Sequence, residues 1–301
     1  MPQPAQRGGS AKSSTDRAQS RTIAASFAIR VLSPGPAHRT SAGVPELFDM
    51  RLREQRRDRA ARAGAELFLF ERAFEDCVER IELARQQFDR ALLIGCPDPR
   101  WPARLERVAS SIDVRDPGPL FAEAAGGVRM IEDTWEPPEG AYDLVLVIGT
   151  LDTVNDLPLA LRLVRHAMKA EGLFIGAIAG GDTLPQLRSA MRSADAVTGL
   201  AAPHVHPRIE PSALSPLLDT AGFVSPVVDV DRVEVSYRSL SRLVADLRAM
   251  GATNVLSAKA PPLTRAQSAA ASRAFIEAGD GGRTIETFEL LHFAAWTPAS
   301  G

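Results

Sequence analysis

The sequence predicts an α/β protein in which a doubly wound, mostly parallel sheet carries an antiparallel edge strand. Strand-like apolar segments alternate with helical segments from residue 91 onward, which is the pattern of strand–helix–strand units. The segment 142–150 is a nearly continuous apolar run, as expected of a parallel strand buried on both faces. The last strand-like segments, 226–237 and 284–298, are long and separated by helices, so they suit an antiparallel pair at one edge.

The stretch before this sheet predicts two helices. Residues 46–62 are mostly charged, and their basic run from Arg51 to Arg62 predicts a solvated helix face or, alternatively, a surface that docks a partner. In residues 65–88 the apolar side chains recur at three- and four-residue steps, which predicts an amphipathic helix with one apolar stripe. The stripe contains Leu67, Phe70, Phe74, Cys77, Ile81, Ala84 and Phe88.

The elements of the sheet region follow in order. Strands are expected over 91–95, 111–114, 127–133, 142–150 and 173–181, before the two long ones. Helices are expected over 101–110, 156–172, 212–223, 239–251 and 263–279. Gly172, Gly222 and Gly251 stand where glycine commonly ends a helix. The antiparallel edge suits the methyltransferase variety of doubly wound, Rossmann-like folds better than the dinucleotide dehydrogenase variety.

The first 43 residues differ from the rest of the chain. They hold one acid, Asp16, against six basic residues, and they are rich in Ser, Ala, Pro and Gly. Such a segment buries too little apolar surface to fold, so residues 1–43 are expected to be a disordered basic tail. An organelle transit peptide is the alternative. Residues 44–301 are then one methyltransferase-like domain, with N-terminal helices over 44–90 and the sheet over 91–301.

Bulk composition excludes several classes of protein. The net charge of −2 gives no general attraction to nucleic acid, and no apolar run is long enough for a transmembrane helix. The only cysteines, Cys77 and Cys96, argue against a disulfide framework and for a reducing compartment. In a bacterium that compartment is the cytoplasm. No cysteine-type metal motif is present, and no metal is expected.

Candidate site residues lie directly after the strands, because ligands of doubly wound sheets bind outside the carboxyl ends of the strands. An acid after the second strand can accept hydrogen bonds from ribose hydroxyls, and one after the third can accept from an adenine amino group. Glycine after the first strand lets backbone N–H groups approach a carboxylate. S-adenosylmethionine (SAM) combines these three groups, although acids at strand ends also serve as caps. The candidate cofactor-binding residues are Gly95, Cys96, Asp113, Glu132, Asp133 and Thr150.

Two further groups of polar residues lie outside this set. Asp182 follows a Gly-Gly pair after the fifth strand, where it is placed to contact a substrate or to cap the next helix. His204 and His206 form an H-x-H pair in a proline-bounded loop, but no third metal ligand has suitable spacing. No G-x-S-x-G elbow for a serine nucleophile occurs, and the sequence identifies no catalytic base.

Several stretches resemble a known family. They are "LFDMRLREQRRDRAAR", "VNDLPLALRLVRHAMKAEGLFIGAIAGGDTLPQLRSAM", "RIEPSALSPLLDTAGF" and "DLRAMGATN". They are similar to the complex I assembly factor family with a methyltransferase fold, over roughly residues 45–297. The resemblance implies a class I SAM-dependent methyltransferase-like fold and a role in respiratory-chain assembly. The mitochondrial member is described as an arginine hydroxylase acting on a core iron–sulfur subunit, and malonyl-carrier-protein methyltransferases are related to it.

The loop after the first strand departs from the family pattern D-L-G-C-G-R-G. Here Pro97 and Pro99 replace glycines and Leu93 replaces the acid, while Gly95 and Cys96 are kept. A proline removes a backbone donor, and losing two donors to a ligand carboxylate weakens binding by roughly 30-fold to several thousand-fold. The cost disappears where a proline begins a helix, since N–H groups are spare there.

Three functions follow as alternatives. The first is a SAM-dependent methyltransferase-fold enzyme that modifies a protein substrate during assembly of respiratory complex I. The modification is methylation or arginine hydroxylation, and a complex I subunit is the candidate substrate. The second is a non-catalytic assembly or scaffold protein whose cofactor loop has degenerated, which the prolines favour. The third is a carrier-protein or small-molecule methyltransferase.

Overall fold

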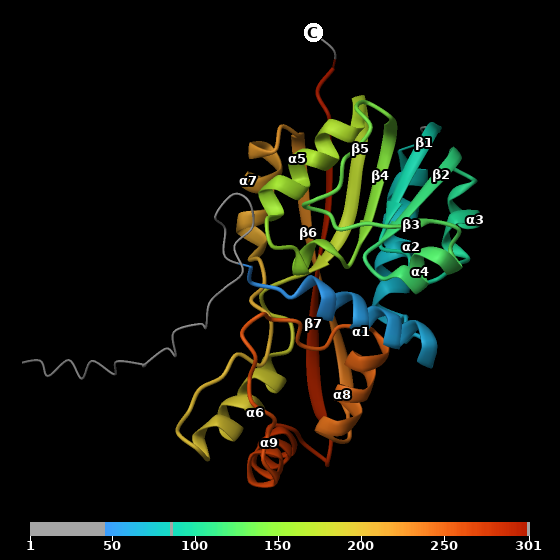
Figure 1. The fold of residues 1–301 in the computed structure, drawn as a ribbon. Helices are drawn as coiled ribbons and strands as arrows, with labels where there is room; N and C mark the ends of the chain where they lie inside the picture. The colour runs from blue at the N-terminus through green and yellow to red at the C-terminus, as the bar shows by residue number, and fades with distance from the viewer. Residues whose placement is uncertain (1–45, 85–86, 300–301) are drawn as a thin grey trace, which may run out of the picture. The chain divides into compact units, whose positions relative to one another are not determined.

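A computed structural model describes residues 46–84 and 87–299, so the expected tail over 1–43 lies outside the described residues. The described residues form a seven-stranded sheet in the order β3-β2-β1-β4-β5-β7-β6 (Figure 1). Strands β1 to β5 pair in parallel, whereas β7 is inserted between β5 and β6 and is antiparallel to both. The predicted fold class, including its antiparallel edge, is therefore confirmed.

The strands occupy most of the expected segments. They are β1 Phe88–Ile94, β2 Ala109–Asp116, β3 Val128–Arg129, β4 Tyr142–Ile148, β5 Met168–Ala179, β6 Val224–Tyr237 and β7 Thr284–Trp296. The third strand was expected over 127–133 but has two residues, because the N–H groups of Thr134 and Trp135 both donate to the carbonyl of Ile131 and turn the chain there. Strand β2 extends beyond the expected 111–114 at both ends.

The helices are short, apart from the two that precede the sheet. They are α1 Met50–Ala63, α2 Phe68–Leu83, α3 Trp101–Leu105, α4 Pro119–Ala124, α5 Leu157–Ala167, α6 Pro185–Ala196, α7 Pro211–Thr220, α8 Leu240–Ala249 and α9 Arg265–Glu277, with a 3₁₀ turn η1 at Leu151–Thr153. Among the described residues, no helix combines the length and the apolar character needed to cross a bilayer.

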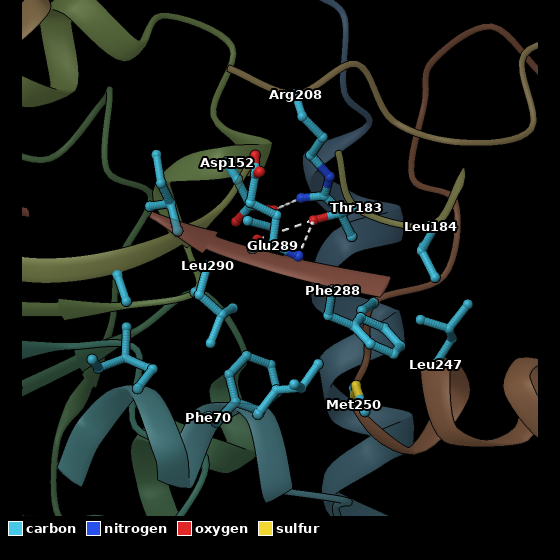
Figure 2. A pocket seen from close by; sticks show the side chains of 18 residues that line it. Phe70, Asp152, Thr183, Leu184, Arg208, Leu247, Met250, Phe288, Glu289 and Leu290 are labelled. Atoms are coloured by element: carbon cyan, nitrogen blue, oxygen red, sulfur yellow. Dashed lines mark hydrogen bonds and ion pairs between the residues drawn. The ribbon is translucent and has the colours of Figure 1, made fainter. Parts of the chain in front are cut away.

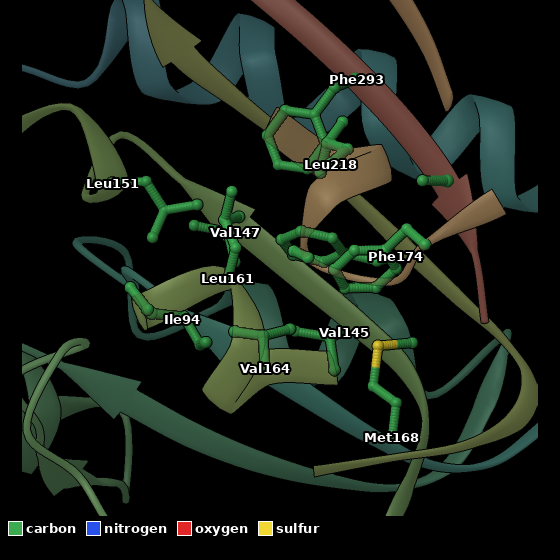
Figure 3. Packing of buried hydrophobic residues seen from close by; sticks show 14 of the residues in the cluster. Ile94, Val145, Val147, Leu151, Leu161, Val164, Met168, Phe174, Leu218 and Phe293 are labelled. Carbon is green, nitrogen blue, oxygen red and sulfur yellow. The ribbon is translucent and has the colours of Figure 1, made fainter. Parts of the chain in front are cut away.

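Each face of the sheet has its own apolar core. Val145 and Val147 of β4 face α5 and α7, where Phe174 stacks on Phe223 at 4.9 Å between ring centroids (Figure 3). Their neighbours Leu144 and Leu146 face α2 on the opposite side. This double burial explains the continuous apolar run that identified β4 in the sequence.

A third core lies beyond the end of the sheet. Helices α6, α8 and α9 pack on the outer parts of β6 and β7, around residues such as Leu243, Phe275 and Phe288. We call these three helices the cap (Figure 1). Leu69 of α2 belongs to the same core, so the cap is joined to the layer that covers one face of the sheet.

Candidate functional site

The acid at the carboxyl end of β2, where a ribose-binding acid was expected, is Asp116. Its side chain is fully buried and accepts hydrogen bonds from Nε and Nη2 of Arg57 at 2.8 and 2.6 Å. The backbone N–H groups of Cys96 and Gly118 donate to the same carboxylate at 2.8 and 2.7 Å. Asp116 thus has four donors from the protein itself.

Asp113 does not lie at this end, and the prediction that placed it there is wrong. It stands inside β2, because the strand continues to Asp116. Its carboxylate accepts hydrogen bonds from the hydroxyl of Tyr142 and from Arg90, each at 2.7 Å. Burial opposes ionisation, but these two donors hold the pKa of Asp113 below its ordinary value.

The acid after β3, Glu132, is also paired with an arginine of α1. Arg53 donates from Nη1 and Nη2 to the two carboxylate oxygens at 2.7 and 2.8 Å, and Glu132 is fully buried. Arg53 Nη2 also donates to the carbonyl of Thr150 at 2.6 Å. Burial acts against the charge of Arg53, yet Glu132 and the nearby carboxylates raise its pKa. Asp133 accepts instead from the N–H of Asp156, at the start of α5.

Helix α1 was expected to present a solvated basic face, and for Arg53 and Arg57 that expectation is wrong. The two arginines expose only 4% and 5% of their surface to solvent. Two glycines make this docking possible: a Cβ on Gly118 would stand 2.8 Å from Cβ of Arg57, and one on Gly251 would stand 3.2 Å from its Cα. Asp49 caps the helix by accepting from the N–H of Leu52.

The loop after β1 begins with a turn that requires glycine but offers few free backbone donors. Gly95 has φ +83°, and a Cβ there would collide with the carbonyl of Ile148, so only glycine fits. Pro97 and Pro99 precede α3 and are not part of it, whereas Pro102 lies in its first turn, where a missing N–H costs little. The nearby carboxylate of Asp98 is buried, and hydrogen bonds from Arg100 lower its pKa.

These contacts test whether the residues present fit SAM. A ribose needs free acceptor capacity on the acid after β2, and adenine needs it on the acid after β3. Asp116 already accepts four hydrogen bonds, two of them from Arg57. At Glu132 the guanidinium of Arg53 occupies the side on which both carboxylate oxygens accept. The N–H of Cys96, which was expected to face the methionine end, donates to Asp116 instead. With α1 docked, the residues do not fit the cofactor, and we assign no step to it.

A second hollow lies at the carboxyl ends of β4 and β5. Polar side chains gather on one side of β7, while Phe70, Phe288 and Leu290 lie on the other (Figure 2). We call this hollow the rim pocket. Its lining comprises Leu69, Phe70, Ala73, Ile148, Gly149, Asp152, Ala177, Ile178, Ala179, Thr183, Leu184, Arg208, Leu247, Met250, Ala252, Phe288, Glu289 and Leu290.

An ion pair between Arg208 and Asp152 lies in the rim pocket. Both side chains are at most one-tenth exposed, and burial lowers the pKa of Arg208 to about 10. A smaller cavity lined by Arg53, Arg57 and His206 shares this pair with the rim pocket. Neither residue is among the candidates that the sequence indicated. Asp152 follows the fourth strand but only Thr150 was selected there, and Arg208 lies in a loop without periodicity.

Asp182 is not among the residues that line the rim pocket. Its side chain is two-thirds exposed and pairs with Arg232 at 3.0 Å. It does not cap α6 either, because the N-cap position is held by Leu184 in a left-handed conformation. A contact between Asp182 and a substrate therefore stays a prediction.

The two loop histidines have separate partners. His204 Nε2 lies 2.8 Å from Asp195, and His206 Nε2 accepts from the N–H of Val255 at 2.8 Å. The described residues hold one cluster with metal-ligand chemistry elsewhere, formed by Asp76, Cys77 and His292. There Asp76 is already paired with an arginine of its own helix, and burial raises the pKa of the Cys77 thiol, which opposes metal binding.

Known proteins resemble this chain along most of its length. No family model matches it. The mouse protein "Arginine-hydroxylase NDUFAF5, mitochondrial" is 30% identical over 282 residues, which cover 87% of this chain and 80% of the mouse protein. The chain belongs to the NDUFAF5 family. A malonyl-[acyl-carrier protein] O-methyltransferase of Xylella fastidiosa (strain M23) is 32% identical over 54% of each chain, and lies within the related group that the sequence indicated.

Solved structures agree on the fold. The YcgJ protein of Bacillus subtilis has a TM-score of 0.52 at 10% identity and covers 75% of this chain and all of its own. BH2331 of Bacillus halodurans C-125, described as a methyltransferase, has a TM-score of 0.51 at 10% identity, covering 74% and 99%. The NDUFAF5 family resemblance and the methyltransferase-like fold are thus both confirmed, and the family's members carry the names of enzymes.

Proposed function

We propose that this chain acts on a protein substrate during assembly of respiratory complex I, and that a side chain of the substrate enters the rim pocket. The observation that carries the proposal is the pocket's place and lining. It opens at the edge of the sheet where this fold binds ligands, with aromatic walls and a buried ion pair. The family name of the mouse relative supplies the chemistry, hydroxylation of an arginine, with methylation as the alternative.

A long side chain with a polar head suits this lining. The aliphatic stem would lie against Phe70 and Phe288, and the head would reach the pair formed by Asp152 and Arg208. An arginine head can donate to Asp152, because a carboxylate has two oxygens and can accept from two guanidinium groups. The proposed location follows the host: the mitochondrial matrix in a eukaryote or the cytoplasm in a bacterium. The mouse relative's name calls that protein mitochondrial.

One observation favours a second function, that of a non-catalytic assembly protein. The acids expected to bind the cofactor are paired with Arg53 and Arg57, and prolines replace two loop glycines. A protein of this kind would bind the same partner without modifying it. The carrier-protein methyltransferase alternative depends on SAM, as does methylation of a protein substrate, and these contacts favour neither over hydroxylation.

Deleting the gene in its native host tests both functions. Complex I is purified from the deletion strain and from strains that carry the wild-type chain, Asp152→Asn or Asp113→Asn, and its subunits are examined by mass spectrometry. We expect one subunit to carry an added oxygen or methyl group in the strains with the wild-type chain and with the Asp113→Asn control. That group should be absent from the deletion strain and from the strain with Asp152→Asn. Complex I that assembles poorly without the chain but never carries a modification supports the scaffold. Complex I that is unaffected by the deletion overturns both.

A further inference from the structure

We propose that α1 is the internal ligand of the adenosine site, and that the docked helix closes this chain to SAM. The inference goes beyond the proposed function, which concerns the rim pocket. It begins with two acids at the carboxyl ends of β2 and β3. Asp116 and Glu132 are each fully buried, and each receives a two-point hydrogen-bonded ion pair from α1.

The arginines replace the groups that adenosine would offer. Ribose hydroxyls and an adenine amino group are hydrogen-bond donors, and so is a guanidinium group. Arg57 donates to Asp116 and Arg53 donates to Glu132, so each acid receives donors from the helix. A guanidinium is also positively charged, which a buried carboxylate favours over the neutral groups of adenosine.

The surrounding backbone is shaped for the docked helix. Gly118 and Gly251 leave the space that Arg57 fills, since a side chain on either would press against it. Phe48, just before α1, is held by the side-chain amide of Asn155, whose Oδ1 accepts from the Phe48 N–H at 2.8 Å and whose Nδ2 donates to the Phe48 carbonyl at 3.0 Å. Asp58, further along the helix, accepts from the N–H of Leu120. The helix is thus anchored on both sides of its arginines.

The loop after β1 closes the other end of the same site. The N–H of Cys96 donates to Asp116, and Pro97 and Pro99 have no N–H to offer. Asp98 adds a buried negative charge whose pKa is lowered by Arg100, so it repels the carboxylate of a methionine group. The loop therefore weakens the hold on the methionine end of SAM, while the docked helix blocks the adenosine end. The apparent affinity for SAM is the intrinsic affinity multiplied by the fraction of molecules in which the helix is undocked.

Equilibrium dialysis of the full chain with SAM and with S-adenosylhomocysteine tests the inference. We expect no saturable binding to the wild-type chain at ligand concentrations up to about 1 mM. The double variant Arg53→Gln, Arg57→Gln is expected to bind at least tenfold more tightly than the wild type. Arg59→Gln, an exposed position on the same helix, is the matched control and is expected to leave binding unchanged.

Three outcomes overturn the inference. The first is wild-type binding at micromolar ligand with the α1 amides still protected from hydrogen exchange. The second is a folded double arginine variant that does not bind. The third is recovery of binding by Pro97→Gly, Pro99→Gly with both arginines present, because the loop alone would then close the site. If the double arginine variant does not fold, the wild-type dialysis and exchange measurements decide the question. Complex I dependence, which tests the proposed function, is not affected by any of these results.

Discussion

The two halves of the carboxyl edge of this sheet are filled in opposite ways. At β1 to β3 the buried acids are neutralised by a charged helix, α1, whose buried face is made of Arg53, Arg57 and Ala60. At β4 and β5 the walls are apolar, and the cap leaves a pocket that a ligand can enter. The strands thus supply a binding edge in both halves. The element that packs against this edge, α1 in one half and the cap in the other, decides whether the edge is closed by the protein or open to a ligand.

Removing an arginine from the closed half is expected to have the largest effect. Arg57→Ala leaves Asp116 buried without its counter-charge, and losing one partner of a buried ion pair costs about 3–5 kcal/mol. Urea unfolding gives the free energy of unfolding of both chains. Arg62→Ala is the control, because its pair with Asp58 is solvent-exposed on the arginine side, and it should change stability by less than about 1 kcal/mol. A similar small effect of Arg57→Ala would show that α1 is not held by this pair.

Acid is expected to lower the free energy of unfolding through His206, which lines the smaller cavity beside the rim pocket. Burial lowers its pKa from 6.5 to about 4, and its Nε2 accepts from Val255 only when it is unprotonated. Between these pH values the unfolded chain binds a proton that the folded chain does not, so stability falls as the pH drops through this window. The loss reaches about 3 kcal/mol near pH 4.

Unfolding free energies measured at pH 7 and pH 5 check this dependence. His206→Gln retains an acceptor for the Val255 N–H but does not titrate, so the difference between the two pH values should shrink in that variant. An unchanged difference would assign the acid sensitivity to other groups.

A side chain at Gly118 is expected to press on the docked helix and to destabilise the closed half of the edge. In Gly118→Ala the new Cβ stands 2.8 Å from Cβ of Arg57 and 3.2 Å from a carboxylate oxygen of Asp116, so helix or loop must shift. Overpacking of this kind costs about 1–3 kcal/mol. Hydrogen exchange should accelerate in α1 while α5, on the other face of the sheet, stays unchanged. Equal acceleration in both helices would contradict a local effect.

Asp113→Asn is expected to have the smallest effect. The carboxylate is partly exposed and bonds Arg90 and Tyr142, contacts that an amide oxygen partly retains. Exposed pairs of this type contribute about 0–1 kcal/mol. Thermal unfolding of Asp113→Asn beside Asp116→Asn checks the contrast, since only the second acid lies at the end of the strand. A larger loss for Asp113→Asn than for Asp116→Asn would contradict the assignment of the stronger contacts to the buried acid.

The fold class could be predicted from the sequence because the patterns that indicate strands and helices are local. Alternating strands and helices predicted the parallel sheet, and the length of the last two strands predicted the antiparallel edge. The site was harder to predict, since β2 ends two residues later than expected and the acid at its carboxyl end is Asp116 instead of Asp113. A strand boundary is a matter of hydrogen bonding with neighbours, which an apolar pattern marks only loosely.

The role of α1 could not be read from its own residues. A run of arginines is typical of a solvated face, and Arg53 and Arg57 are buried only because acids 79 and 59 positions further along the chain receive them. The same holds for Arg208 and Asp152, which come from separate loops and meet in the rim pocket. Pairings between distant residues of opposite charge leave no periodic trace in a single sequence.

The anchoring of α1 has a consequence for how the polypeptide is made. The N–H of Asp49 donates to the carbonyl of Val255, and the N–H of Ser257 donates to the carbonyl of Leu47. A ribosome synthesises α1 about 200 residues before the partners of these bonds, so both pairs exist only after residue 257 has left the exit tunnel. The first helix of the described residues therefore reaches its final place only after the rest of the sheet has been synthesised up to β6.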